Sequence, residues 1–482
     1  MHHTPITSKS QDKIQINGQI DAFFKCFQIG TLLDRAGIHK RHGYRVCSLI
    51  KTIFTLPFIG KNFFRGIVIN EDVGFGKDAA YEILKGSQYN WRKLILNLAV
   101  KLHSFFNRLT SDDRQGVLII DDSTYDRSRS KMVELLCRIR DHSSNRYLTG
   151  FRMLTMCWSD GVSCLPVDFA LLSSSNAKNR LQGIHKSLDK RTCGYRRRAE
   201  AIQKSTVHLE SMVKRALAAG IKAKYVLMDS WFGMPATIAK IALHLDVICM
   251  VKKTPKVHYN YNNQSMDLIA IYKRLKKRRG RAKIKASVIV ALPDGTPVKL
   301  VFVRDSRKTD WLALLSTDVT LDDDQIIQMY GKRWDIEVFF KMVKQHLRLA
   351  KEIQSRDYDA LIAHTSIVFM RYMFVVYQNR ITTDHRTFGD LFYACCDELE
   401  DISFLQALHR LLMLTVSRIQ KIGTFCEKTA QTLFDAIIQT ALECVNMSKI
   451  EFGTVITQLS GLKCASIISI RYINKITNFI EL

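Results

Sequence analysis

Three carboxylates in this sequence stand where rigid elements could bring them together. Asp122 follows the apolar run 117–120, Asp229 follows the apolar run 225–228, and Glu337 lies in a segment with helical spacing. Two hard divalent cations need such acidic oxygens if they are to bind a scissile phosphate, activate a nucleophile and stabilise the leaving oxygen. The pattern predicts two-metal phosphoryl transfer.

The segment around Glu337 predicts one helix over about 321–347, opened by Thr320 and Asp323 at capping-box spacing. A single face of that helix, within roughly 60° at 3.6 residues per turn, would carry Tyr330, Arg333, Glu337 and Lys344. The spacing alone also fits an ordinary surface salt bridge between Arg333 and Glu337, which are four residues apart. Both interpretations stay open at this point.

Strands and helices alternate around the two aspartates. Strands are expected over 117–120, 151–158, 162–172, 225–228 and 247–251, with a hairpin turn at Asp160 and Gly161 and helices over 196–219 and 235–245. Three strands, a helix, a strand, a helix and a strand match the order of a ribonuclease-H-like core. In that core the first and fourth strands lie side by side, so Asp122 and Asp229 could converge.

A β-rich insertion is expected between the second aspartate and the glutamate, over 254–319, with strands over 286–292, 298–303 and 311–315. Nine of its thirteen residues from 273 to 285 are Lys or Arg, and none is acidic. Such a run can be a solvated loop, but its length and the net charge favour contact with phosphates. The phosphate contacts are assigned to Lys276, Lys277, Arg278 and Arg279.

The fold class expected is α/β, a mixed-sheet core flanked by helical regions. The predicted divisions are a helical DNA-binding domain at 1–110, the core at 111–253, the insertion at 254–319, the glutamate helix at 320–350 and a helical C-terminal region at 351–482. Residues 32–42 could form the turn of a helix-turn-helix, or an ordinary helix could end at Gly37. Residues 361–377 are expected to form a buried helix because His364 and Arg371 interrupt an apolar run.

The charge balance favours a polyanionic partner. The 482 residues include 72 Lys and Arg against 45 Asp and Glu, a net charge of +27, which points to nucleic acid. The sequence contains neither a charge-free apolar run of about 18 residues nor a signal peptide, so nothing in it suggests a membrane protein. The twelve cysteines are scattered without metal-binding spacing, as expected of reduced thiols in a cytoplasmic protein.

A resemblance strengthens the metal-site interpretation. Tyr330, Arg333, Glu337 and Lys344, separated by two, three and six residues, resemble the Tyr-Arg-Glu-Lys signature of the insertion-sequence-four family of bacterial DDE transposases. The segments 120–124 and 226–231 look like the first and second aspartate motifs of that family. The resemblance runs from about residue 29 to residue 377.

The resemblance implies a ribonuclease-H-like core with a β insertion and cut-and-paste movement of DNA. Asp122, Asp229 and Glu337 would then bind two Mg²⁺ or Mn²⁺ ions, and Asp122 is preferred to Asp121 because it directly precedes a Ser-Thr pair. Near the cleaved DNA end, contacts would come from Tyr330, Arg333 and Lys344.

The implied partners are terminal inverted repeats and target DNA, with a homodimer when DNA ends are synapsed and with the bacterial nucleoid as location. Relatives flip a base onto an aromatic residue, and Trp311 is a candidate for that role, although a core tryptophan on a strand is the plainer interpretation. Two alternatives stay open: a ribonuclease-H-like nuclease without strand transfer, and a transposase-derived DNA-binding protein that does not cleave.

Overall fold

The computed structural model describes residues 11–69, 74–109, 115–141, 145–185, 187–278, 282–304 and 310–381. The chain divides into two compact units, residues 1–395 and 396–482, and all the described residues lie in the first. Arg279 and most of the region 351–482, expected to be helical, therefore lie outside the described residues.

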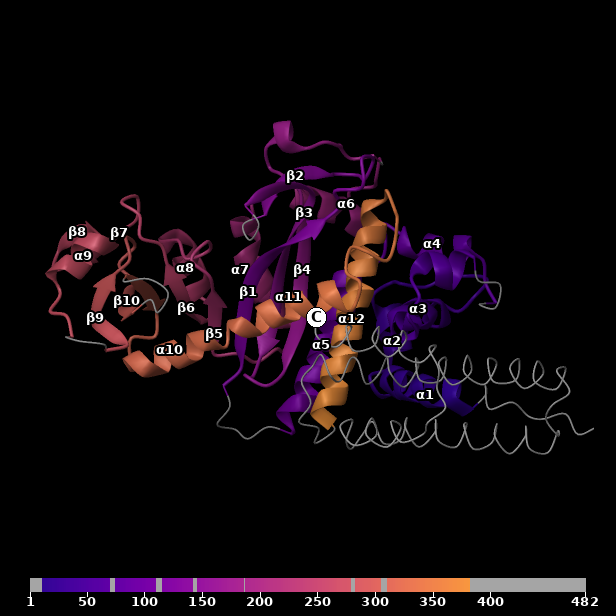
Figure 1. Ribbon diagram of the computed structural model, residues 1–482, viewed down its shortest axis with the longest axis horizontal. Helices are drawn as coiled ribbons and strands as arrows, with labels where there is room; N and C mark the ends of the chain where they lie inside the picture. The colour runs from indigo at the N-terminus through magenta and orange to yellow at the C-terminus, as the bar shows by residue number, and fades with distance from the viewer. Residues whose placement is uncertain are drawn as a thin grey trace, which may run out of the picture. The chain divides into compact units, whose positions relative to one another are not determined.

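A mixed sheet forms the centre of the unit (Figure 1). Its strands here are β1 (Val117–Asp126), β2 (Cys137–Asp141), β3 (Arg146–Ser159), β4 (Cys164–Leu172), β5 (Tyr225–Met228) and β6 (Asp246–Val251). β3 pairs antiparallel with both β1 and β4, while β1, β5 and β6 are parallel neighbours. The order β4-β3-β1-β5-β6 fits the ribonuclease-H-like core expected from the sequence.

Three details of the core differ from expectation. β2 was not predicted, because three of its five residues are charged and only Cys137 and Ile139 are buried. β1 does not stop at the aspartates, since residues 121–126 continue to pair with β3. The single helix expected over 196–219 is two helices, α6 (Cys193–Ala201) and α7 (Ser205–Ala218). α8 (Pro235–Ala242) begins at its proline as predicted.

The insertion continues the sheet. It contains β7 (His258–Tyr261), β8 (Gln264–Asp267), α9 (Leu268–Arg274), β9 (Ile284–Ala291), β10 (Pro297–Arg304) and β11 (Trp311–Ser316). β11 pairs antiparallel with β6, so core and insertion share one eleven-stranded sheet. The three predicted strands are confirmed, and Gly295, with φ of 92°, turns the chain between β9 and β10.

Helices precede the sheet in sequence. They are α1 (Gln11–Cys26), α2 (Ile29–Arg35), α3 (Val46–Thr55), η2 (Leu56–Ile59), η3 (Phe64–Val68), α4 (Lys77–Leu84) and α5 (Trp91–Asn107). The connection between α2 and α3 spans residues 36–45, longer than the three or four residues of a helix-turn-helix turn. Its second residue, Gly37, has a φ of 70°, which favours the ordinary helix end.

The glutamate segment is two helices, α10 (Asp323–Gly331) and α11 (Trp334–Gln345), so the expected unbroken helix was wrong. The capping box is also formed by Asp322 and Gln325 instead of Thr320 and Asp323. The Thr320 hydroxyl donates to Asp318 instead. Tyr330 therefore belongs to a different helix from Glu337 and Lys344.

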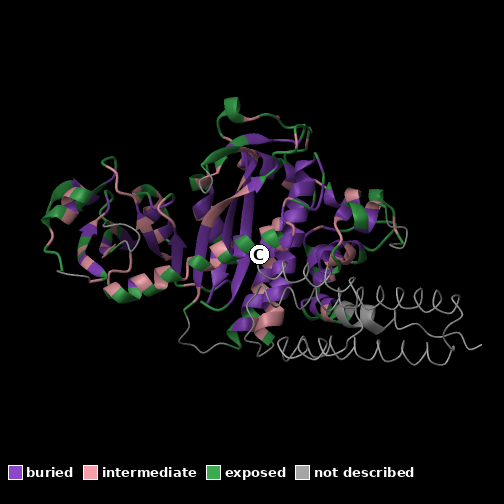
Figure 2. Cartoon of the chain, in the orientation of Figure 1, coloured by how far each residue is buried: buried purple, intermediate pink, exposed green. Residues whose placement is uncertain are grey.

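α12 (Tyr358–Ile381) is the buried helix expected from the sequence (Figure 2). By length and composition it alone among the described helices passes a test for a membrane span, but 94% of that apolar window is buried inside the protein. Its Arg371 is fully buried and pairs with Glu352, while also donating to the carbonyl of Phe54. These features are those of a core helix.

Candidate active site

The first two acidic positions meet where the parallel pairing of β1 and β5 ends. The last paired residues are Ile120 of β1 and Met228 of β5. Asp121 and Asp229 follow directly, and parallel neighbours place such residues at the same edge of a sheet. The charge of Asp229 also acts on the Asp121 carboxyl, as expected for neighbouring side chains.

α11 brings the third carboxylate to this edge. Its Ile336, Phe339 and Val343 are buried, and the Phe339 ring packs against that of Tyr372 on α12 at 4.8 Å. This packing leaves Glu337 on the side that faces β1. The Arg333 guanidinium, just before α11, lies between two acids, donating to Asp121 at 3.2 Å and to Glu337.

A cleft of about 500 Å³ opens between these elements, and we call it the carboxylate cleft. It brings together all three sequence-predicted metal residues together with Lys344. Its lining consists of Asp121, Asp122, Ser123, Thr124, Asp141, Arg152, Asp229, Ser230, Trp231, Phe232, Lys252, Glu337 and Lys344.

The two members of the aspartate doublet have different partners. Neighbouring residues of a strand point to opposite faces of a sheet. Asp121 is paired with Arg333 near α11, whereas Asp122 accepts a hydrogen bond from Arg152 of β3 at 2.8 Å. Asp121 is therefore the member of the doublet that shares its surroundings with Asp229 and Glu337.

The electrostatics of Asp121 reflect this crowding. Burial raises its pKa to about 7, the nearby charge of Asp229 adds to the rise, and Arg333 opposes it. A carboxylate in this environment favours binding of an additional cation. The positive charge would offset both the cost of burying the negative charge and the repulsion from Asp229. Oxygen-only acidic donors are the ligands that Mg²⁺ and Mn²⁺ prefer.

Cations surround the acids in the cleft. Lys344 donates to the hydroxyls of Ser123 at 2.5 Å and Thr124 at 3.4 Å, and burial lowers the pKa of its ammonium group. The Tyr330 ring lies 5.7 Å from the Arg333 guanidinium, and its buried hydroxyl finds no hydrogen-bond partner in the described part of the chain. Burial raises the pKa of that phenol, so it remains a hydrogen-bond donor.

No three acidic, histidine or cysteine side chains among the described residues already meet closely enough to hold an ion. The reason is visible in the cleft, where the Arg333 guanidinium occupies the space between Asp121 and Glu337. The donor chemistry fits a hard cation, whereas the spacing requires Arg333 to withdraw from one of the two acids.

The basic run and Trp311 lie outside the cleft. Lys276, Lys277 and Arg278 follow α9 beside β9, five strands from β1 in the sheet order, or ~24 Å at the usual strand spacing. Arg278 lies 3.6 Å from Asp323, and Trp311 packs against the Tyr272 ring at 4.5 Å. Arg279 lies outside the described residues.

Several lining residues escaped sequence reasoning. Asp141 belongs to the unpredicted β2, and Arg152 and Lys252 have no motif that sets them apart from other cations. Trp231 could have been noticed, since an aromatic residue two positions after a strand-end aspartate lies at the same sheet edge. The other three depend on strand pairings that no local pattern encodes.

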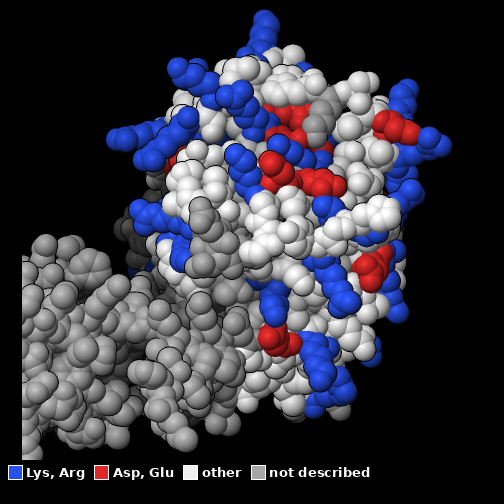
Figure 3. All heavy atoms as spheres, turned by 90° about the vertical axis from the view of Figure 1, so that its right-hand side faces the viewer, with Lys and Arg blue, Asp and Glu red and all other residues white. Residues whose placement is uncertain are grey.

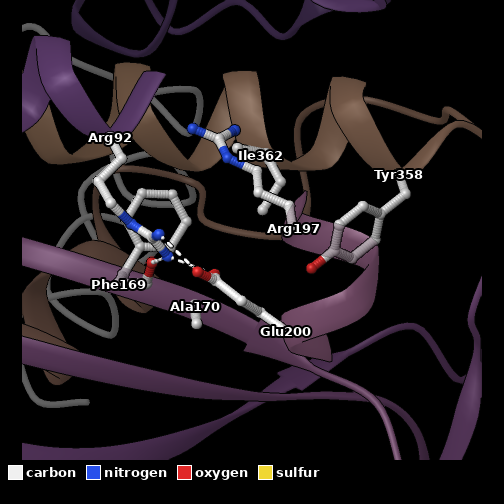
Figure 4. Close-up of a pocket in the computed structure, with 7 residues that line it drawn as sticks. All are labelled: Arg92, Phe169, Ala170, Arg197, Glu200, Tyr358 and Ile362. Atoms are coloured by element: carbon white, nitrogen blue, oxygen red, sulfur yellow. Dashed lines mark hydrogen bonds and ion pairs between the residues drawn. The ribbon is translucent and has the colours of Figure 1, made fainter. Parts of the chain in front are cut away.

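A second pocket shows a contrasting arrangement (Figure 4). It has room for about 10 Å³ between α5, α6, β4 and α12, enough for one water-sized molecule at most. Arg92 pairs there with Glu200 at 2.7 Å and with Asp168 at 2.8 Å. Arg197 points toward Ile362 in the same pocket, and no hydrogen bond or ion pair joins it to the other residues drawn in Figure 4. This pocket is too small for a substrate.

The surface carries the charge expected from composition. On the face seen in Figure 3, Lys and Arg side chains cover more of the described area than Asp and Glu. Positive side chains spread over such an area attract a polyanion without specifying its sequence.

One comparison with known proteins agrees with this geometry. A family model described as "DDE superfamily endonuclease" matches residues 67–291, which include both aspartate positions and end before Glu337. The match supports a DDE transposase and a ribonuclease-H-like core. Among curated proteins, no relative matches the chain.

Among solved structures, the chain is similar to one in a "Drosophila P element transposase strand transfer complex", at 10% identity and a TM-score of 0.18. The similarity covers 48% of this chain and 49% of that one, so it spans about half of either protein. A superposition this weak bears on neither fold nor function.

Proposed function

We propose that this chain, whose central region matches the DDE superfamily endonucleases, is a DNA transposase that cleaves element ends and joins them to target DNA. The observation that carries the proposal is the carboxylate cleft. Carboxylates from β1, the end of β5 and α11 line one cavity although more than a hundred residues separate each from the next in the sequence. A surface salt bridge alone would not place Glu337 there.

The metal ions proposed are two Mg²⁺ or Mn²⁺, held by Asp229, Glu337 and one member of the aspartate doublet. When bound, they would activate the attacking water or 3′ hydroxyl and stabilise the leaving oxygen. The doublet remains a choice between two residues. The Ser-Thr pair that follows favours Asp122, whereas the surroundings favour Asp121, because the charge of Asp229 acts on it and it shares the Arg333 guanidinium with Glu337.

The chain's other residues would hold the DNA. Arg333 can exchange an acid for a phosphate oxygen, since its planar guanidinium binds either in the same two-pronged way. Lys344 can bind a phosphate oxygen as a point charge in place of the Ser123 and Thr124 hydroxyls, and Tyr330 has a buried hydroxyl to donate. These three residues are proposed to bind the DNA strand next to the cleaved phosphate.

The wider DNA path is proposed to reach the basic run. At ~3.4 Å per base pair, the ~24 Å from β1 to β9 corresponds to about seven base pairs. Lys276, Lys277 and Arg278 would then contact the duplex away from the cut, together with Arg279 of the same run. Terminal inverted repeats and target DNA are the proposed partners, bound by a homodimer in the bacterial cytoplasm.

The test uses full-length protein and a plasmid that carries its coding region with the native flanking DNA. With Mg²⁺, the wild type should nick and release the element, while Asp229→Asn and Glu337→Gln should lose cleavage and keep DNA binding. The matched control is Glu210→Gln, which removes the acid from a surface ion pair four residues from Lys214. It should cleave normally.

Cleavage by Glu337→Gln at the wild-type rate would contradict the metal assignment. Joined products distinguish the functions, because cut ends that are never joined to a second DNA indicate a nuclease. DNA binding with no cleavage by the wild type in Mg²⁺ or Mn²⁺ would indicate the non-cleaving alternative.

A further inference from the structure

The edge of the sheet next to the carboxylate cleft carries an exposed pair of arginines. β2 is the terminal strand of the sheet order, and burial alternates along it, with two apolar residues buried and Arg138 and Arg140 exposed. Antiparallel pairing puts Arg140 opposite Tyr147 of β3, which is 60% exposed. We call β2 and the segment 146–150 of β3 that pairs with it the β2–β3 ribbon. One face of this ribbon presents guanidinium groups and a phenol to solvent.

These side chains suit phosphate binding better than protection of a strand edge. Charged residues on an edge strand can simply prevent pairing with another chain. An exposed aromatic ring does not serve that purpose, yet the Arg138 guanidinium lies 4.3 Å from the centroid of the Tyr147 ring. The ring supports the flat guanidinium, whose N–H groups can still bind a phosphate in two-pronged geometry. Arg140 donates to the neutral side-chain oxygen of Asn145, a contact that does not compensate its charge.

Arg152 of β3 joins the ribbon to the carboxylate cleft. One nitrogen of its guanidinium donates to the Asp122 carboxylate at 2.8 Å, and another donates to the backbone carbonyl of Arg140 at 2.7 Å. Asp141, the last residue of β2, lines the cleft itself. The ribbon therefore begins at the wall of the cleft.

The ribbon and the basic run lie on opposite sides of β1 in the sheet order. β2 is two strands from β1 in one direction, and β9, beside the basic run, is five strands away in the other (Figure 1). At the usual strand spacing, ~34 Å of sheet separates the two basic regions. That length is about one turn of a DNA duplex. A single duplex can therefore meet both regions, with the carboxylate cleft between them.

We propose that the β2–β3 ribbon binds backbone phosphates of duplex DNA on the side of the cleaved phosphate away from the basic run. The proposal rests on the proposed transposase function and assigns one basic region to each side of the cut. Phosphate contacts fix the position of a duplex without reading its bases. The ribbon therefore binds DNA of any sequence.

The experiment is ethylation interference, in which an ethylated phosphate blocks binding wherever the protein contacts it. Full-length protein is bound to native DNA that flanks its coding region, without divalent metal. The wild type should show two groups of sensitive phosphates about ten base pairs apart. Replacing Arg138 and Arg140 together by glutamine should remove one group and lower the slope of log affinity against log salt by at most about 2. Replacing Lys276, Lys277 and Arg278 together by alanine should remove the other group.

Two double variants control the test. Arg138→Lys with Arg140→Lys keeps both charges and should keep the salt slope, which separates loss of charge from loss of the fold. Lys214→Gln with Lys240→Gln removes two exposed charges from α7 and α8, outside the carboxylate cleft. This variant should keep both groups of phosphates.

The proposal is overturned if the glutamine variant of the ribbon keeps both groups, or if the Lys214 and Lys240 variant loses one of them equally. A cut in Mg²⁺ that maps outside the interval between the two groups also overturns it. A wild type that cleaves, with contacts unchanged in the ribbon variant, leaves the transposase function standing without the ribbon. Two separable groups on DNA that is never cleaved keep the ribbon as a DNA contact and overturn the transposase function.

Discussion

Two regions of this molecule use the same residue types with opposite results. Next to α12, Glu352 is fully buried, which by itself raises its pKa, but Arg371 and His364 bring that pKa down to about 2. In the carboxylate cleft, burial and the neighbouring Asp229 raise the pKa of Asp121 to about 7, and Arg333 only partly opposes them. We call Glu352 and its partners the α12 ion cluster.

The difference distinguishes an ion cluster that stabilises the fold from a group of acids that can bind a metal ion. The acid in the α12 ion cluster has the Arg371 guanidinium and the His364 ring at hydrogen-bond distance, so its charge is already satisfied by the fold. The cleft instead gathers acids near one another and shares a single guanidinium between two of them. An excess of negative charge of this kind is how a protein prepares a place for a cation.

The largest expected effect lies inside the aspartate doublet. Asp121→Asn should reduce Mg²⁺-dependent cleavage more than about 100-fold, because even indirect partners of metal ligands cost 10–100-fold. Asp122→Asn, which weakens the pairing with Arg152, should cost less. Initial cleavage rates of both variants on the same plasmid decide the matter. If Asp122→Asn instead lost more activity than Asp121→Asn, Asp122 would be the metal ligand.

The next effect concerns Arg198, a buried arginine that is paired with acids, and its neighbour Arg197. Arg198 pairs with Glu134 at 2.7 Å and with Asp359 at 3.0 Å, all three fully buried. Arg198→Met should lower the free energy of unfolding by about 3–5 kcal/mol, since it takes the cation away from buried carboxylates. Urea unfolding followed by circular dichroism measures the change.

Arg197→Met is the control for that prediction. Burial and the nearby charge of Arg92 lower the pKa of Arg197 to about 10, and a neighbouring phenol, thiol and carboxylate only partly oppose this shift. Its replacement by an apolar residue should leave the free energy of unfolding unchanged or raise it. Equal losses for Arg197→Met and Arg198→Met would mean that pairing is not what decides their contribution.

A smaller effect should appear as pH dependence in the α12 ion cluster. Because the folded-state pKa of Glu352 is depressed to about 2, its stabilisation is present above its unfolded pKa of about 4.5 and is lost as pH falls toward 2. The difference in unfolding free energy between wild type and Glu352→Gln, about 3 kcal/mol at neutral pH, should shrink over that range. A difference independent of pH would argue against the pairing with Arg371.

The smallest effect is expected far from both regions. Replacing Lys276, Lys277 and Arg278 together by alanine should lower the slope of log affinity against log salt by at most about 3, one unit for each phosphate that is no longer bound. Cleavage at saturating DNA should stay near the wild-type rate, because these residues do not line the cleft. Fluorescence anisotropy at several salt concentrations gives the slope, and an unchanged slope would identify the run as a solvated loop.

Local patterns in the sequence were enough for much of the fold. Apolar runs located β1, β5 and β6, and apolar segments of β character, two of them on either side of an Asp-Gly turn, located β9, β10 and β11 in the insertion. They failed where the local signal is weak, as at β2 with its charged residues, or where a helix ends without a proline, as between α10 and α11.

The sequence by itself determined which residues could do chemistry, because Asp229, Glu337 and the doublet are recognisable from their type and from the strands and helix that carry them. Only the tertiary structure decided which partners they face. The pairing of β1 with β5 sets Asp121 beside Asp229, and the Arg152 contact sets Asp122 apart. Moving by one residue along a strand moves the side chain to the opposite face of the sheet. Which face carries the site is defined only after strands and helices have packed.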